Sequence, residues 1–206
     1  MPDGMTWADA AAIPFGACTA LHYLRRKGNV RRGERVLVLG ASGAVGAAAV
    51  QIARHDGAHV TAVCSAGNAE LVRGLGAETV IDYAREDFTR GDATWDVILD
   101  CIGGTDYRRA RRVLRRGGRL LRVVTSLGGQ IVAPLQGRLR GHRVIAGVAP
   151  GSAEDLAAAI DLARSGALRP VIDATYPLSR VADAHARVDS GRKRGSVVLT
   201  LGPANA

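Results

Sequence analysis

The stretch that decides the fold is Arg35-Val36-Leu37-Val38-Leu39-Gly40-Ala41-Ser42-Gly43-Ala44-Val45-Gly46. Its consecutive apolar residues, followed by regularly spaced glycines, predict a buried parallel strand that runs through a tight turn into a helix. We expect Gly40 to allow the turn, Gly43 to let the backbone approach a pyrophosphate, and Gly46 to let the helix pack closely on the sheet. The free N–H groups and the dipole at such a helix start favour anions.

This glycine spacing differs from the dinucleotide fingerprint Gly-x-Gly-x-x-Gly, so the motif by itself is weak evidence. A tight strand–helix turn that binds nothing is the alternative. We favour the phosphate-binding interpretation because the glycines lie between a strand and a helix.

Strand and helix patterns alternate through the middle of the chain. After the first strand, further strands are expected at 58–64, 79–82, 95–100, 119–124 and 142–148, and helices at 43–55, 68–75 and 105–116. This alternation predicts an α/β fold of the Rossmann type: a doubly wound, parallel, six-stranded sheet with helices on both faces. Before the first strand we expect a short helical turn that ends at Pro14, then a helix over 18–27.

The C-terminal part predicts a separate αβαβ segment. Ser152 caps a helix that Gly166 ends, and a second helix begins at Ser179 and places Val181, His185 and Val188 on one face. His185 is therefore interpreted as a core histidine. The strands expected at 170–174 and 196–201 follow an already complete sheet, so we expect them to need another sheet to pair with.

Composition indicates a globular protein of one or two domains. The chain has 206 residues, of which 47% are hydrophobic, and a formal net charge of +9. No apolar run approaches the ~20 residues of a membrane helix, and nothing at the N-terminus resembles a signal peptide. The three cysteines are widely spaced, and the five histidines form no metal-ligand pattern, so we expect a cytoplasmic protein without zinc.

Arginines are densest in the segment from Arg108 to Arg122. Such a cluster could bind nucleic acid or an acidic partner. No aromatic residue after Tyr107 interleaves with it to stack on bases. We therefore favour a solvated helix face over a nucleic-acid-binding surface.

Several motifs together resemble the medium-chain dehydrogenase/reductase superfamily, in its zinc-independent quinone oxidoreductase (zeta-crystallin-like) branch. They are Ala11-Ala12-Ile13-Pro14 with Thr19-Ala20, the glycine turn Gly40–Gly46, Leu75-Gly76-Ala77, Val80-Ile81-Asp82-Tyr83, Asp96-Val97-Ile98-Leu99-Asp100, Gly117-Gly118-Arg119, Arg169-Pro170-Val171-Ile172-Asp173 and Gly195-Ser196-Val197-Val198-Leu199.

The resemblance implies a division of the chain into three parts. Residues 1–34 would be lead-in helices, 35–150 an NAD(P)-binding Rossmann domain, and 151–206 the helices and strands that rejoin a catalytic domain in relatives. That GroES-like catalytic domain normally precedes the nucleotide-binding part, and this chain begins where it would end. We therefore expect the chain to represent the nucleotide-binding half of such an enzyme.

The end of the second strand bears on the choice of cofactor. An NAD-selecting site places Asp or Glu there, whereas Val63 to Asn68 contains no acid and Glu70 is the first. This absence permits NADP, and Ser65 can donate to phosphate oxygens. Many relatives carry a basic residue where this chain has Asn68, so Arg73 and Arg192 are considered as substitutes.

The resemblance also assigns further cofactor contacts. Ser42, Gly43, Ala44 and Val45 would hold the pyrophosphate, Tyr83 would lie near the adenosine 2′-phosphate, and Thr19 would reach the nicotinamide. Ordinary packing is the alternative for Tyr83 and Thr19. The nicotinamide pocket would be lined by Ile102, Val124 and Thr125, at carboxyl ends of strands where ligands of open α/β sheets bind. Cys101 is interpreted as a small buried filler.

The resulting functional hypothesis is transfer of a hydride from NADPH to a quinone or an α,β-unsaturated carbonyl. No catalytic residue can be named from the sequence. A non-catalytic NADP-binding module is the alternative. The resemblance further implies a homodimer in which the strand at 142–148 pairs with its two-fold mate. The C-terminal strands would then be loosely held or packed on a partner chain.

Overall fold

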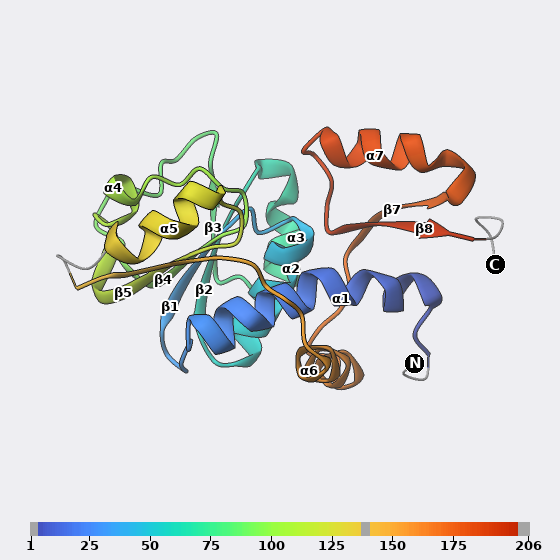
Figure 1. Cartoon of the computed structure of the whole chain (residues 1–206), viewed down its shortest axis with the longest axis horizontal. Helices are drawn as coiled ribbons and strands as arrows, with labels where there is room; N and C mark the ends of the chain where they lie inside the picture. Colours follow the sequence, from blue (N-terminus) through green and yellow to red (C-terminus); the bar gives the residue numbers. More distant parts are fainter. Residues whose placement is uncertain (1–3, 137–140, 202–206) are drawn as a thin grey trace.

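The computed structural model describes residues 4–136 and 141–201. Six parallel strands form the central sheet shown in Figure 1, in the order β3-β2-β1-β4-β5-β6. This order is the doubly wound arrangement predicted from the alternation of strands and helices. The strands are β1 (Arg35–Leu39), β2 (His59–Cys64), β3 (Thr79–Asp82), β4 (Trp95–Asp100), β5 (Leu114–Arg122) and β6 (Arg143–Ala146).

Helices cover both faces of this sheet, and β1 shows why. Val36 and Val38 point into one hydrophobic cluster, whereas Leu37 and Leu39 point into the other. The first face carries α1 (Trp7–Leu21), α2 (Ala44–His55), α3 (Ala69–Gly74) and α6 (Ala153–Arg164), and the second carries α4 (Tyr107–Ala110) and α5 (Leu127–Gln136). A strand buried on both faces reads as a continuous apolar run, as β1 does.

The prediction that a helical turn ends at Pro14 was wrong. α1 runs through Pro14 to Leu21 and continues as a π-helical segment to Lys27. A proline inside a helix costs about 3 kcal/mol, but burial of side chains such as Ile13 and Leu21 contributes about 1.5–3 kcal/mol each. Both are almost fully buried. Packing of α1 against α2 and α6 therefore outweighs the local signal.

The prediction of one arginine-rich helix over 105–116 was also wrong. α4 is a single turn that Asp106 caps, and β5 begins already at Leu114, which pairs with Trp95. Pairing with β4 overrides the local helical pattern. The sequence reading also missed α5, whose two glycines and one proline disfavour a helix.

The C-terminal segment forms a small unit beside the sheet. Its strands β7 (Ile172–Pro177) and β8 (Ser196–Thr200) pair with each other in parallel, connected by α7 (Val181–Asp189). Within the described residues they thus form a two-stranded sheet of their own, and their pairing with a further domain stays a prediction. In Figure 1 the unit lies beyond the six-stranded sheet, and α1 extends out to contact β7 and β8. His185 is exposed on α7, so its interpretation as a core histidine was wrong.

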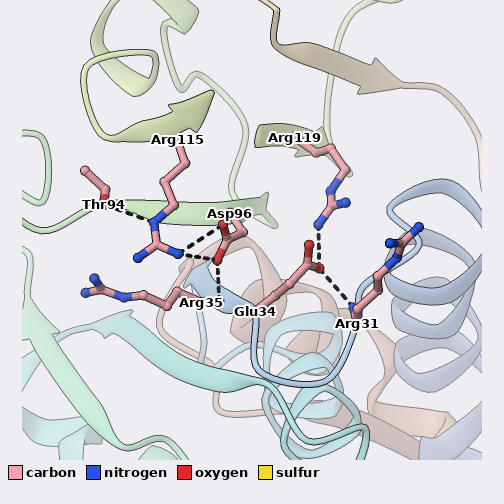
Figure 2. Close-up of polar contacts among 7 residues, drawn as sticks. All are labelled: Arg31, Glu34, Arg35, Thr94, Asp96, Arg115 and Arg119. Carbon is pink, nitrogen blue, oxygen red and sulfur yellow. Dashed lines mark hydrogen bonds and ion pairs between the residues drawn. The ribbon is translucent and has the colours of Figure 1, made fainter. Parts of the chain in front are cut away.

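Ion pairs connect the strands at their amino-terminal edge, which Figure 2 shows. Glu34 accepts hydrogen bonds from the Arg31 backbone N–H at 2.9 Å and from Arg119 Nη2 at 2.5 Å. Asp96 accepts from the Arg35 N–H at 2.8 Å and pairs with Arg115 at 3.1 Å. Each carboxylate at the start of β1 and β4 thus meets an arginine of β5.

Candidate cofactor-binding site

The three glycines of the turn after β1 serve different needs. Gly40 has a φ of +73°, a conformation that favours glycine. A Cβ on Gly46 would overlap the carbonyl oxygen of Gly40, so the fold itself requires glycine there. At Gly43 the φ is −79°, and a Cβ would meet only the Gly40 oxygen, at an ordinary 3.5 Å. Packing of the fold therefore does not require glycine at position 43, and the space beside it is open.

A cleft of about 1140 Å³ opens beside this turn at the carboxyl edge of the sheet. Three parts of the chain line it: the glycine turn, the segments after β2, β3 and β4, and the C-terminal unit. In that order the lining residues are Gly40, Ser42 and Gly43; Cys64, Ser65, Gly67, Asn68, Leu71, Tyr83, Cys101 and Ile102; and Val171, Ile172, Asp173, Arg187, Val188, Gly191, Arg192, Lys193 and Arg194.

The cleft brings together much of the site that the sequence predicted. Seven predicted residues line it: Ser42, Gly43, Ser65, Asn68, Tyr83, Ile102 and Arg192. Ala44 and Val45 begin α2 directly behind Gly43, where their backbone N–H groups lie at the helix start. Val124 is exposed and lies beside Gly103. Thr19 in α1 and Thr125 are partly buried and do not line the cleft.

Hydrogen bonds connect the glycine turn to the segment after β2. The amide of Asn68 donates to Ser42 Oγ at 3.0 Å. Gly40 and Ala41 both donate to the carbonyl of Val63 at 3.1 Å. These bonds hold two walls of the cleft at a fixed separation, and they use one donor of the Asn68 amide.

The C-terminal unit contributes cations that the sequence reading did not assign to the site. Beside Arg192 the cleft is lined by Arg187, Lys193 and Arg194, and Asp173 is the one carboxylate among the described lining residues. The motif Gly-Arg-Lys-Arg-Gly at 191–195 was visible in the sequence, but its place opposite the glycine turn depends on the tertiary structure. The cleft is therefore strongly cationic.

Asp173 organises these cations. Arg187 donates two hydrogen bonds to it, at 2.6 and 2.8 Å, and the Arg194 backbone N–H donates a third at 2.8 Å. The Arg187 hydrogen bonds hold the pKa of the Asp173 carboxyl below its usual range. Burial lowers the pKa of Lys193, whose ammonium donates to the carbonyl of Gly195 at 2.7 Å. Asp173 thus neutralises Arg187, while Lys193 lies close to the glycine turn.

Backbone contacts attach this unit to the glycine turn. The Gly195 N–H donates to the Ser42 carbonyl at 2.8 Å, and Gly195 forms an isolated parallel bridge with Gly43. The C-terminal unit is therefore packed on α1 and on the glycine turn of the same chain, rather than loosely held.

A smaller cavity of about 260 Å³ shares Tyr83 and Ile102 with the cleft. Its wall includes the loop after β4, which the fully buried Asp100 holds in place. That carboxylate accepts the N–H groups of Ile102, Gly103 and Thr105 at 2.9–3.2 Å. Ile102 remains 60% exposed, so it offers an apolar surface to whatever enters either cavity.

Cysteine thiols in the cleft are not activated. Burial is the main cause that raises the pKa of both thiols. The neighbouring carboxylate adds to it, which is Asp82 for Cys64 and Asp100 for Cys101. Both thiols are therefore protonated near neutral pH and unsuited to nucleophilic chemistry. Cys101 is partly buried and lines the cleft, so it is more than a filler of the core.

Within residues 4–136 and 141–201, no group of three or more His, Cys, Asp or Glu residues is arranged to hold a metal ion. Within the same ranges, no helix has the length and apolar character needed to cross a membrane.

Comparison with known proteins defines the class. Residues 75–199 match the family described as zinc-binding dehydrogenase. The chain therefore belongs to this family, within the medium-chain dehydrogenase/reductase superfamily, and the resemblance to its quinone oxidoreductase branch is confirmed.

Individual relatives are oxidoreductases. The mouse protein named NAD(P)H oxidoreductase RTN4IP1, mitochondrial, is 34% identical over 97% of this chain and 57% of its own length. The tomato 2-methylene-furan-3-one reductase is 34% identical over 96% of this chain and 48% of its own. The quinone oxidoreductase of Coxiella burnetii superposes with a TM-score of 0.88 at 26% identity, over 97% of this chain and 62% of that chain.

The chain thus spans about half the length of the curated relatives it matches. The relatives are themselves named as NAD(P)H or NADPH-dependent oxidoreductases, and the superposition confirms the Rossmann-type fold of this chain. Some of them are named as mitochondrial or chloroplast proteins, so the cytoplasmic location stays a prediction.

Proposed function

We propose that this chain is the cofactor-binding part of an NADPH-dependent oxidoreductase that reduces a quinone or an α,β-unsaturated carbonyl compound. The observation that carries the proposal is the cationic cleft beside a glycine turn with unused space at Gly43. An anionic dinucleotide fits these residues, because backbone N–H groups and guanidinium groups are the donors that phosphates prefer. The relatives include a 2-methylene-furan-3-one reductase, an alkenal/one oxidoreductase and a quinone oxidoreductase, which supports the substrate class.

In this proposal, residues 35–150 form the cofactor-binding domain, and the segments 1–34 and 151–206 flank it. Gly43 and the first N–H groups of α2 bind the pyrophosphate. Lys193 adds a charge beside them, because its ammonium lies at the Gly195 carbonyl. Thr19, Val124 and Thr125 remain proposed contacts of the nicotinamide end, and Tyr83 of the adenosine end.

The chemistry supplied by bound NADPH is hydride donation, and the chain's own residues bind and orient the donor. The exposed apolar side chain of Ile102 lines one side of the cleft, where it would cover the bound cofactor and exclude water from it. Neither thiol of the cleft is ionised, so neither competes for an electrophilic enone.

We propose NADPH rather than NADH for an electrostatic reason. The segment Ser65 to Asn68 carries no carboxylate that would bond a ribose 2′-hydroxyl or repel a 2′-phosphate. The cations of the opposite wall outnumber the single carboxylate, which is already paired with Arg187. A dinucleotide that carries one more phosphate group should therefore bind to this cleft with higher affinity.

Binding and turnover test the proposal separately. Calorimetric titration with NADPH and NADH is expected to show a higher affinity for NADPH. Oxidation of NADPH is then followed at its absorbance maximum with a benzoquinone and an α,β-unsaturated ketone as acceptors. Turnover supports an enzyme, whereas binding without turnover by the full-length protein favours the non-catalytic module. Absence of binding by either dinucleotide contradicts both.

We further propose a homodimer through β6, the last strand of the sheet order. An edge strand presents unpaired backbone groups that a two-fold mate can complete. Val148, just after β6, is an apolar residue that is 75% exposed.

Light scattering is expected to give a dimer mass for the parent and a monomer mass for Val148→Asp. The matched control is Leu178→Asp, which changes an exposed residue outside the sheet and should leave the dimer intact. A monomeric parent, or a dimer that survives Val148→Asp, contradicts this interface.

A further inference from the structure

The segment after β2 lacks a cation of its own to neutralise a 2′-phosphate. It contributes Ser65, Gly67 and Asn68 to the cleft, and none of these is charged. One donor of the Asn68 amide is already engaged by Ser42. Arg73, on the following helix, is not among the described residues that line the cleft. Selectivity for the extra phosphate must therefore come from another wall.

Arg194 brings a guanidinium from the opposite wall to this segment. Its Nη2 donates to the carbonyl of Gly67 at 3.1 Å and lies 3.9 Å from the point where a Cβ on Gly67 would stand. In dinucleotide-binding folds, the end of the second strand is where the adenosine ribose and its 2′ substituent are recognised. The contact thus places a cation beside the segment after β2, which contributes no basic residue of its own to the cleft.

The backbone of Arg194 is fixed, while its charge is not neutralised. Its N–H donates to the paired carboxylate of Asp173. Among the described residues, no carboxylate forms an ion pair with the Arg194 side chain, whereas Arg187 is paired with Asp173. A guanidinium has five donors in a planar fork that matches phosphate oxygens. Arg194 therefore has donors to spare beyond the bond to Gly67.

The neighbouring cations occupy other positions. Lys193 donates to Gly195, beside the glycine turn, where a pyrophosphate would lie. Arg187 donates a bond to the carbonyl of Arg192 and two to Asp173. Of the cations that line the cleft, Arg194 is the one with a described bond to the segment after β2.

We propose that Arg194 is the specificity-determining residue that makes this chain prefer NADPH over NADH, by binding the 2′-phosphate across the cleft from Ser65. The proposal rests on the function proposed above. It assigns to Arg194 the role that the sequence alone suggested for Arg73 or Arg192.

The test compares Arg194→Gln with the parent in calorimetric titrations of NADPH and NADH. Charge-assisted hydrogen bonds of this kind change affinity by about 10- to 100-fold. We expect Arg194→Gln to weaken NADPH binding by that factor while NADH binding changes less than about threefold. Arg194→Lys, which keeps the charge and loses the fork, should recover part of the NADPH affinity.

Arg73→Gln and Arg180→Gln are the matched controls, because neither cation is among the described residues that line the cleft, and each should alter the NADPH preference by less than about threefold. Arg192→Gln, which removes a cation of the cleft itself, should reduce the NADPH preference less than Arg194→Gln does. Titrations with adenosine 2′,5′-bisphosphate and with ADP isolate the adenosine end. Arg194→Gln should weaken the first ligand and spare the second. Circular dichroism spectra and melting temperatures confirm that each variant is folded.

The outcomes separate this inference from the proposed function. A parent that binds neither dinucleotide contradicts the proposed function, and the inference with it. A parent that prefers NADPH while Arg194→Gln keeps the same preference overturns the inference alone. Equal weakening of NADPH and NADH in Arg194→Gln also overturns it, because Arg194 would then act on the pyrophosphate or on closure of the cleft.

Discussion

The two edges of the six-stranded sheet hold their charges in different ways. At the amino edge, Glu34 and Asp96 each accept a backbone N–H and an arginine, so positive and negative groups compensate (Figure 2). At the carboxyl edge, cations from the C-terminal unit line the cleft beside the glycine turn, and Asp173, the one carboxylate among the described lining residues, is already paired with Arg187. The paired charges of the amino edge connect strands and stabilise the fold. The unpaired cations of the cleft are instead available to bind an anion. Variants at the two edges should therefore separate stability from binding.

The largest effect is expected at Gly46. In Gly46→Val the new side chain would overlap the carbonyl of Gly40 and the Cα of Ala41. These are backbone atoms, which cannot move aside. Overpacking of this kind costs about 3 kcal/mol or more. We expect the variant to be largely unfolded or to melt far below the parent, as measured by circular dichroism. A melting temperature close to that of the parent would contradict the packing described for the turn.

Gly43→Val should lose binding while the fold survives. Only the Gly40 oxygen lies near the new Cβ, and the backbone conformation suits any residue. The side chain would instead occupy the space proposed for the pyrophosphate. We expect NADPH affinity to fall about 100-fold or more, which corresponds to about 2.7 kcal/mol. Calorimetry measures this loss, and a folded variant with parental affinity would show that phosphates bind elsewhere.

At the amino edge the reverse is expected. In the pair between Glu34 and Arg119 the side chains are only 21% and 12% exposed. Arg119→Gln would leave Glu34 partly buried without its cation, which should cost about 2 kcal/mol in urea unfolding. The matched control is Arg115→Gln, because the Arg115 side chain is 45% exposed and the loss should be about 0.5 kcal/mol. NADPH affinity should be unchanged in both, and a loss of affinity would undermine the separation of the two edges.

The smallest effect is a pH-dependent one at Asp173. Its folded pKa is depressed by Arg187, so its stabilisation is fully present above the unfolded pKa of about 3.9 and is lost as the pH falls through the folded value. Asp173→Asn should therefore melt below the parent at pH 7, with a gap that closes as the pH drops below about 3.9. In Asp183→Asn, where the pair with Arg180 is exposed, little gap is expected. A constant gap at all pH values would mean that the Asp173 charge is not the cause.

Local patterns gave much of the sheet correctly. Long apolar runs such as Val36–Leu39 and Val97–Leu99 form buried parallel strands, because strands covered on both faces must be apolar throughout. The Ser152 cap is present, with its Oγ accepting the Asp155 N–H. Errors fell where long-range packing outweighs local preference. Pro14 lies inside α1 because that helix is held by α2 and α6, and Leu114 is a strand residue because Trp95 pairs with it.

The sequence by itself determined the class of fold and one half of the candidate site. Strand, turn and glycines are adjacent in the chain, so Gly40, Gly43 and the residues after β2 could be assigned from spacing. Only the tertiary structure decided the other half. Gly195 contacts the glycine turn and Arg194 contacts the segment after β2, because β7 and β8 pair and dock on α1, more than a hundred residues away in the chain. Local spacing carries no information on such contacts, since they depend on how whole elements pack against one another.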